Sequence, residues 1–139
     1  MSNTLNSIAF HHLCVALNDF SKALKFYKNL GYKCTEPVVD PLQNVELVLC
    51  TSEFSPTIEL VRPISEQSPV INYLKRSGEI VYHTCYEVDD IEKDVKEMFL
   101  NNRAICVSRP KPAILFENRL AAFYYVNEVG LIEILQRNK

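Results

Sequence analysis

One short pattern occurs twice in this sequence, and the repeat limits the folds open to the chain. The segments His12–Phe20 (HLCVALNDF) and His83–Ile91 (HTCYEVDDI) each begin with a histidine and carry a cysteine two residues later. Each then reaches an aspartate, Asp19 or Asp90, just before a segment with helical apolar spacing. The copies lie roughly 70 residues apart, which is longer than the units of a solenoid. The pattern therefore predicts two related modules.

Both halves of the chain read as β-α-β-β-β, because alternating segments indicate strands and i, i+3, i+4 spacing indicates a helix. We expect an α+β fold of two tandem βαβββ modules that form a curved eight-stranded mixed sheet around a cup. We place module 1 at about 8–64, a connector at 65–78 and module 2 at about 79–136, within one domain, 1–139. The expected strands are 8–17, 32–39, 44–51, 57–62, 79–88, 104–108, 120–126 and 131–135, with an irregular turn at 109–112. The expected helices are 20–30, 68–78 and 91–99.

Composition narrows the class of protein. A chain of 139 residues with 47% apolar and 23% charged residues is typical of one globular domain. A net charge of −2 gives no reason to propose nucleic acid or a membrane as partner. The segment Met1–Ser7 lacks the features of a signal peptide. The five cysteines are odd in number and form no Cys-x-x-Cys, so we expect reduced thiols and a cytoplasmic location.

A glutamate stands in the middle of the last predicted strand of each module, at Glu59 and at Glu133. One explanation is two amphipathic sheets whose glutamates face water. The repeat argues against it, because two of the three histidines, His12 and His83, also occupy equivalent places. Two imidazoles and two carboxylates suit nickel, zinc, cobalt, manganese or iron. A cation would also offset the cost of burying the carboxylates.

The chain resembles the vicinal oxygen chelate superfamily over nearly its whole length. Within it, the sequence is most similar to methylmalonyl-CoA epimerases and to small bacterial glyoxalase I-like proteins. Four segments carry the resemblance, and the connector Arg62–Lys75 is also similar to that of the epimerases. The four segments are Phe10–Ala16 (FHHLCVA), Ile58–Pro63 (IELVRP), Tyr82–Ile91 (YHTCYEVDDI) and Gly130–Leu135 (GLIEIL).

The resemblance implies that His12, Glu59, His83 and Glu133 bind one divalent metal ion (Ni, Zn, Co or Mn). It also implies an isomerase or lyase that transfers a proton next to the carbonyl of a thioester or of a glutathione-adduct thiohemiacetal. Glu59 and Glu133 would remove and return that proton. The expected partners are this small substrate and a second copy of the chain, as a homodimer.

Two further residues are candidates through the same resemblance. Glu46 matches an extra acid of some epimerases, and its alternative is a solvent-facing strand residue. Arg119 is a candidate for an anionic group of the substrate. The epimerases commonly show Gly-Gly-x-Arg before the long strand, whereas this chain has Glu117-Asn118-Arg119 and keeps only the arginine. Just before the last strand they tend to carry Gly-Gly, whereas this chain has the single Gly130. These departures leave the CoA substrate open.

Two other functions stay open at this point. An Fe(II) ring-cleaving dioxygenase would use two histidines and one carboxylate, whereas this chain supplies a second glutamate. A metal-free protein that sequesters small molecules or drugs would need none of the four ligands.

Overall fold

A computed structural model describes residues 7–138, and these residues form two compact units. The first unit is His12–Tyr82. The second combines the described residues up to His11 with those from His83 onward. The chain crosses from one unit to the other inside two strands. We expect no signal peptide in Met1–Ser7, and of this segment only Ser7 is among the described residues.

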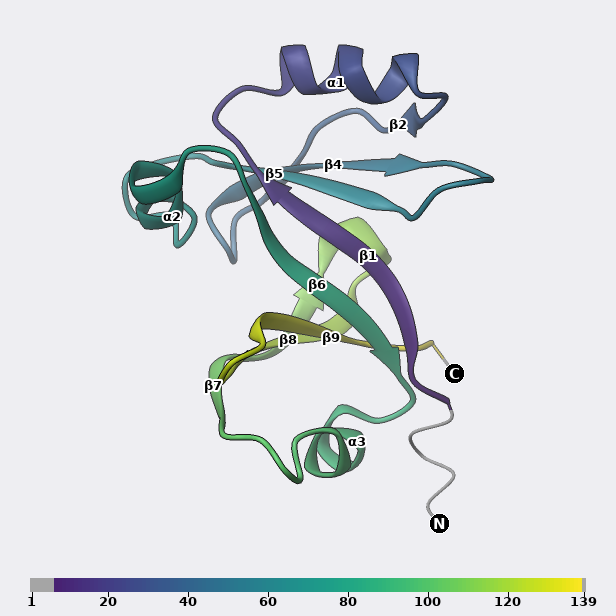
Figure 1. Cartoon of the computed structure of the whole chain (residues 1–139), viewed down its shortest axis with the longest axis vertical. Helices are drawn as coiled ribbons and strands as arrows, with labels where there is room; N and C mark the ends of the chain where they lie inside the picture. Colours follow the sequence, from purple (N-terminus) through teal and green to yellow (C-terminus); the bar gives the residue numbers. More distant parts are fainter. Residues whose placement is uncertain (1–6, 139) are drawn as a thin grey trace. The chain divides into compact units, whose positions relative to one another are not determined.

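The first unit has strand order β2-β4-β5-β1 (Figure 1). β3 pairs with β4. β1 and β5 run parallel, and the other pairs are antiparallel. Its elements are β1 (Ala9–Ala16), α1 (Phe20–Asn29), β2 (Lys33–Cys34), β3 (Val38–Asp40), β4 (Val45–Thr51), β5 (Ile58–Pro63) and α2 (Ile71–Ser77).

The second unit repeats this plan with strand order β6-β9-β8-β7. β6 and β9 run parallel, and β8 pairs antiparallel with β9 and with β7. Its elements are β6 (Ile80–Val88), α3 (Ile91–Met98), β7 (Ala104–Ala113), the 3₁₀ turn η2 (Ile114–Phe116), β8 (Arg119–Val126) and β9 (Gly130–Gln136).

The repeated aspartates begin the two main helices. The Asp19 side chain accepts a hydrogen bond from the backbone N–H of Ser21, and Asp90 accepts one from that of Lys93. Each bond satisfies a backbone donor that the first helical turn leaves unpaired. Asp90, rather than the adjacent Asp89, is the N-cap residue of the second helix.

Each helix covers one face of the sheet in its own unit, and a hydrophobic core lies beneath it. In the first unit the core joins Phe20 of α1 to Leu60 of β5. In the second unit it joins Ile91 of α3 to Ile134 of β9. The buried cores account for the apolar spacing of both helices.

Three expected elements differ from the structure, and proline explains two of the differences. The strand expected at 32–39 is divided into β2 and β3 around Pro37. The turn expected at 109–112 is instead part of the edge strand β7, whose pairing shifts register at two places. An edge strand tolerates Pro110 and Pro112 because their missing N–H groups need not face a neighbour. α2 begins at Ile71 rather than near Ser68, because Ser68 forms a separate turn with Ser65.

The predicted α+β class with two βαβββ modules is confirmed. Residues 7–138 contain nine strands in place of the expected eight, because β2 and β3 divide one expected strand. Among residues 7–138, the helices are too short and too polar for any of them to cross a bilayer.

Candidate functional site

The first unit buries His12 and Glu59 beside one another. β1 and β5 run in parallel register with Cys14 next to Glu59, and His12 precedes Cys14 by two residues. Alternation along a strand therefore places all three side chains on one face of the sheet. Nε2 of His12 lies 3.5 Å from Oε1 of Glu59. His12 is fully buried, and Glu59 is 4% exposed.

The second unit builds the same pair from His83 and Glu133. β6 and β9 run in parallel register with Cys85 next to Glu133, and His83 precedes Cys85 by two residues. Nε2 of His83 lies 3.1 Å from Oε1 of Glu133, and both residues are buried. The repeat seen in the sequence is thus a repeat of local geometry.

The strand that flanks each glutamate differs between the units. Phe123 of β8 lies opposite Glu133, and its ring contacts the His83 ring edge to face at a centroid distance of 5.0 Å. In the first unit Leu49 of β4 lies opposite Glu59. The aromatic residue beside His83 and Glu133 therefore has an aliphatic counterpart in the first unit.

The chemistry of these residues fits a divalent metal. Each unit supplies one imidazole nitrogen and one carboxylate, the nitrogen and oxygen donors that zinc, nickel, cobalt and manganese accept. Burying an ionised carboxylate is costly unless a positive charge or hydrogen bonds compensate it. Cys14 and Cys85 are fully buried beside the glutamates, where they act as small apolar walls.

Glu46 does not join Glu59. Glu46 lies three positions before Leu49, the partner of Glu59 on β4, so Glu46 points to the opposite face of the sheet. There Nε of Arg62 donates to Oε1 of Glu46 at 2.6 Å, and the Arg62 guanidinium lies over the Phe20 ring. Glu46 therefore lies on the side that α1 covers.

Arg119 takes part in a polar cluster of the second unit. Its Nη1 donates to Oε2 of Glu87 at 2.7 Å, and its Nη2 lies 3.4 Å from Nε2 of His11. Glu87 follows His83 by four residues on β6, which places it on the same face of the sheet. The cluster therefore shares a sheet face with His83 and Glu133.

The neighbours of Glu87 favour the ionised form of its carboxyl group. Burial alone would raise the pKa of this carboxyl, but the hydrogen bond from Arg119 and the charges of His11, Arg119 and Arg137 lower that pKa below its usual value. Arg119 and Glu87 keep only 14% and 22% of their side-chain surface exposed. The pair is ionised at neutral pH.

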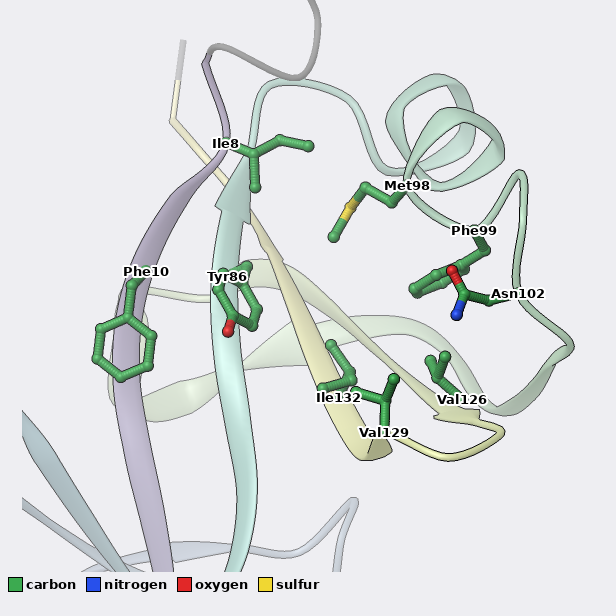
Figure 2. Close-up of a pocket in the computed structure, with 9 residues that line it drawn as sticks. All are labelled: Ile8, Phe10, Tyr86, Met98, Phe99, Asn102, Val126, Val129 and Ile132. Carbon is green, nitrogen blue, oxygen red and sulfur yellow. The ribbon is translucent and has the colours of Figure 1, made fainter.

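An apolar cavity of about 390 Å³ lies on the other face of the second unit. Tyr86 and Ile132 line it. Tyr86 lies three positions after His83 on β6, and Ile132 directly precedes Glu133 on β9, so both point to the opposite face of the sheet from the pair. Figure 2 shows Met98 and Phe99 reaching from the end of α3 toward these strands. The cavity is thus separated from the histidine–glutamate pair by the sheet.

Several contacts were missed by sequence reasoning. Phe123 could have been found by pairing the last two strands, since it falls opposite Glu133. Glu87 could have been found as the polar residue four positions after His83, on the same face of the predicted strand. Asp94 carried no clear signal, yet it is buried and accepts hydrogen bonds from the backbone N–H groups of Asp89 and Asp90.

Comparison with known proteins shows the family of the chain. Residues 11–123 match the family model described as the Glyoxalase/Bleomycin resistance protein/Dioxygenase superfamily. The chain is 32% identical over 130 residues to the mitochondrial methylmalonyl-CoA epimerase of Bos taurus, covering 91% of this chain and 73% of that protein. It is 36% identical over 104 residues to the Dictyostelium discoideum epimerase, covering 73% of this chain but only 61% of that protein.

A solved structure shows the same fold. The Streptomyces coelicolor methylmalonyl-CoA epimerase, in complex with 2-nitronate-propionyl-CoA, superposes with a TM-score of 0.75 at 20% identity, covering 94% of this chain and 98% of that one. The family match and the bovine relative each span most of the chain. The chain therefore belongs to the glyoxalase/bleomycin resistance protein/dioxygenase superfamily.

Proposed function

We propose that the protein is a metal-dependent epimerase that moves a proton at the carbon next to the carbonyl of a CoA thioester, with methylmalonyl-CoA as the first substrate to test. One observation carries the proposal: each unit holds a buried glutamate within 3.5 Å of a buried histidine, in the same strand register. The similarity to methylmalonyl-CoA epimerases supports the choice of substrate.

We further propose that His12, Glu59, His83 and Glu133 together hold one divalent ion. The proposal rests on their donor chemistry, on the burial of both pairs and on the repeat, and it leaves the identity of the metal open. When bound, such an ion supplies Lewis acidity that lowers the pKa of the C–H next to a coordinated carbonyl.

The two glutamates are our candidates for moving the proton. An epimerase must remove a proton from one face of the reacting carbon and deliver one to the other face, so it needs two acid–base groups. Oε1 of Glu59 and Oε1 of Glu133 are the matching atoms of the two units, and each faces an imidazole. Phe123 keeps the His83 ring in place beside Glu133.

Arg119 is our candidate for recognising an anionic group of the substrate. Glu87 fixes one end of its guanidinium on the sheet face that carries His83. A fixed guanidinium binds a carboxylate with little further loss of side-chain freedom. We expect Arg119→Lys to raise KM much more than it lowers kcat, because lysine keeps the charge but loses the planar fork.

For Glu46 we propose a structural role, because its carboxylate is bonded to Arg62 on the helix-covered face. Glu46→Gln should then lower the free energy of unfolding and leave proton exchange in place. A Glu46→Gln protein that keeps its fold and metal but loses exchange would return Glu46 to the proton-transfer set.

The experiment that tests the function is deuterium exchange. Metal-loaded protein is incubated with methylmalonyl-CoA in D₂O, and deuterium at the reacting carbon is followed by mass spectrometry. We expect exchange that stops after chelation and in Glu133→Gln. Metal-loaded, folded protein that catalyses no exchange would overturn the proposal.

The comparisons favour the epimerase over the other functions. The glutathione–methylglyoxal adduct serves as the contrasting substrate, and we expect no turnover of it. Measured metal in the purified protein would argue against a metal-free binding role. We also propose that the protein is a homodimer and is located in the cytoplasm. Light scattering of the purified protein measures its oligomeric state.

A further inference from the structure

Two cysteines of the first unit lie directly opposite one another on neighbouring strands. Cys34 on β2 pairs with Cys50 on β4 in antiparallel register. Both lie outside the histidine–glutamate pair, because Cys50 belongs to the core beneath α1. This juxtaposition has no part in the proposed epimerase chemistry.

The hydrogen bonding next to this pair fixes its geometry. The backbone N–H of Thr35 donates to the carbonyl oxygen of Leu49 at 2.9 Å. The backbone N–H of Leu49 donates to the hydroxyl of Thr35 at 3.0 Å, so one main-chain bond and one side-chain bond join Thr35 to Leu49. Cys34 and Cys50, next to them in the register, occupy a non-hydrogen-bonded position. Cα atoms in such pairs lie about 4.5 Å apart, with their side chains close. Disulfides span Cα separations of about 4.4–6.8 Å, so the backbone can accept a bond between the two sulfurs without moving.

The two thiols differ in their surroundings. Cys50 is fully buried, whereas Cys34 is partly exposed on a two-residue strand at the edge of the first unit's sheet. Burial, the hydrogen bond that the Cys50 thiol donates to Cys34 and the charge of Cys34 raise the pKa of the Cys50 thiol to about 12. Since the thiolate is the reactive form, Cys34 is the thiol that reacts first.

We propose that Cys34 and Cys50 are a modification site that forms a reversible disulfide within the chain when the protein meets a peroxide. The Cys34 thiolate attacks one peroxide oxygen, so an S–O bond forms, the O–O bond breaks and the departing hydroxide is protonated to water. The Cys50 sulfur then attacks the Cys34 sulfur, the S–S bond forms and the S–O bond breaks. The Cys50 proton leaves with that hydroxide as a second water. The two thiols lose two electrons, and the peroxide gains them.

Conversion of Cys34 to the sulfenic acid also prepares the second step. The negative charge of Cys34 is one cause of the high Cys50 pKa, and it disappears when the sulfenic acid forms. A thiol such as glutathione reverses the bond by exchange.

The sequence allows the disulfide between Cys34 and Cys50 to be identified in a single tryptic peptide. Trypsin cleaves after Lys33 and then after Lys75, because Arg62 is followed by Pro63. Residues 34–75 are released as one peptide that holds Cys34 and Cys50 and no other cysteine. After native protein is treated with hydrogen peroxide and alkylated, we expect this peptide unalkylated and lighter by about 2 Da than the reduced form. Reduction should restore two alkylation sites.

Two variants give the controls, and each is first checked for native circular dichroism. Cys106→Ser removes an exposed cysteine of the second unit and should leave the product unchanged. Cys34→Ser should leave Cys50 open to alkylation after peroxide treatment and unfolding. The proposal is overturned if folded wild-type protein keeps both thiols at peroxide levels that oxidise Cys106. It is also overturned if Cys34 ends as a sulfinic acid or in a bond between two chains.

Discussion

The two units carry the same histidine–glutamate pair in different surroundings. In the second unit Nε2 of His83 lies 3.1 Å from Oε1 of Glu133, and the Phe123 ring packs on the imidazole. In the first unit Nε2 of His12 lies 3.5 Å from Oε1 of Glu59, and Leu49 takes the place of the aromatic ring. The two units also differ further along the strands that carry the histidines, β1 and β6.

Four residues beyond the histidine, the first unit has a fully buried Ala16, and the second has the ionised Glu87 bonded to Arg119. The donor pair is therefore the part of the repeat that both units keep. The environment around it differs: in the described residues β6 of the second unit carries a charged cluster where β1 of the first unit carries Ala16. We infer that the pairs do the shared chemistry and that the second unit recognises the polar end of the substrate.

The largest expected effect comes from removing one carboxylate charge at a time. We expect Glu133→Gln and Glu59→Gln each to lower kcat about 100- to 10,000-fold, because each removes one acid–base group. The measurement is the rate of epimerisation of methylmalonyl-CoA, with circular dichroism as a check on folding. An effect confined to one of the two variants would show that the units do not share the proton transfer.

Exchanging the flanking residues tests whether the aromatic residue beside His83 matters. Phe123→Leu gives the second unit the residue of the first, and it should lower the free energy of unfolding by about 1–2 kcal/mol through the lost ring contact and a small void. We expect only a several-fold loss of kcat, since Glu133 stays in place. Urea unfolding and steady-state kinetics measure the two effects, and Leu49→Phe is the reciprocal variant. Loss of activity as large as in Glu133→Gln would contradict a positioning role.

The charged cluster should make the stability of the second unit depend on pH. The folded pKa of Glu87 is lower than its unfolded value, so its stabilisation is present above the usual glutamate pKa of about 4.3 and is lost as the pH falls through the folded pKa. We expect Glu87→Gln to cost about 1 kcal/mol at pH 7 and less under acid conditions. Urea unfolding of both proteins at several pH values checks this. A difference that does not shrink on acidification would exclude linkage to Glu87.

An exposed ion pair of the first unit provides the smallest effect and the matched control. Lys75 and Glu66 lie 2.8 Å apart, but their side chains are 64% and 71% exposed. Such pairs contribute little because water and salt screen them. Glu66→Gln should therefore change the free energy of unfolding by less than about 0.5 kcal/mol. A cost equal to that of Glu87→Gln would show that burial does not explain the difference between the two pairs.

Much of the fold followed from sequence because local patterns agree with it. Asp19 and the apolar spacing after it were sufficient to place α1, and alternation around His83 was sufficient to place β6. The continuation of β7 through Pro110 was not visible, because only pairing with β8 shows that this strand is an edge.

The candidate site divides in the same way. The four ligand candidates were found because they recur with the module repeat. The face on which Glu46 lies could not be read from its own strand, since it depends on the register with β5. The bond between Arg119 and Glu87 joins residues 32 positions apart in sequence and likewise needed the tertiary structure.

The central claim is that the two histidine–glutamate pairs serve one metal ion. The most direct measurement is metal per chain by elemental analysis in the wild type, in His12→Ala and in His83→Ala, each purified without chelator. We expect one ion per chain in the wild type and a similar loss of that ion in both variants, although the histidines belong to different units. Two ions per chain, or a variant that keeps its full metal content, would contradict the claim.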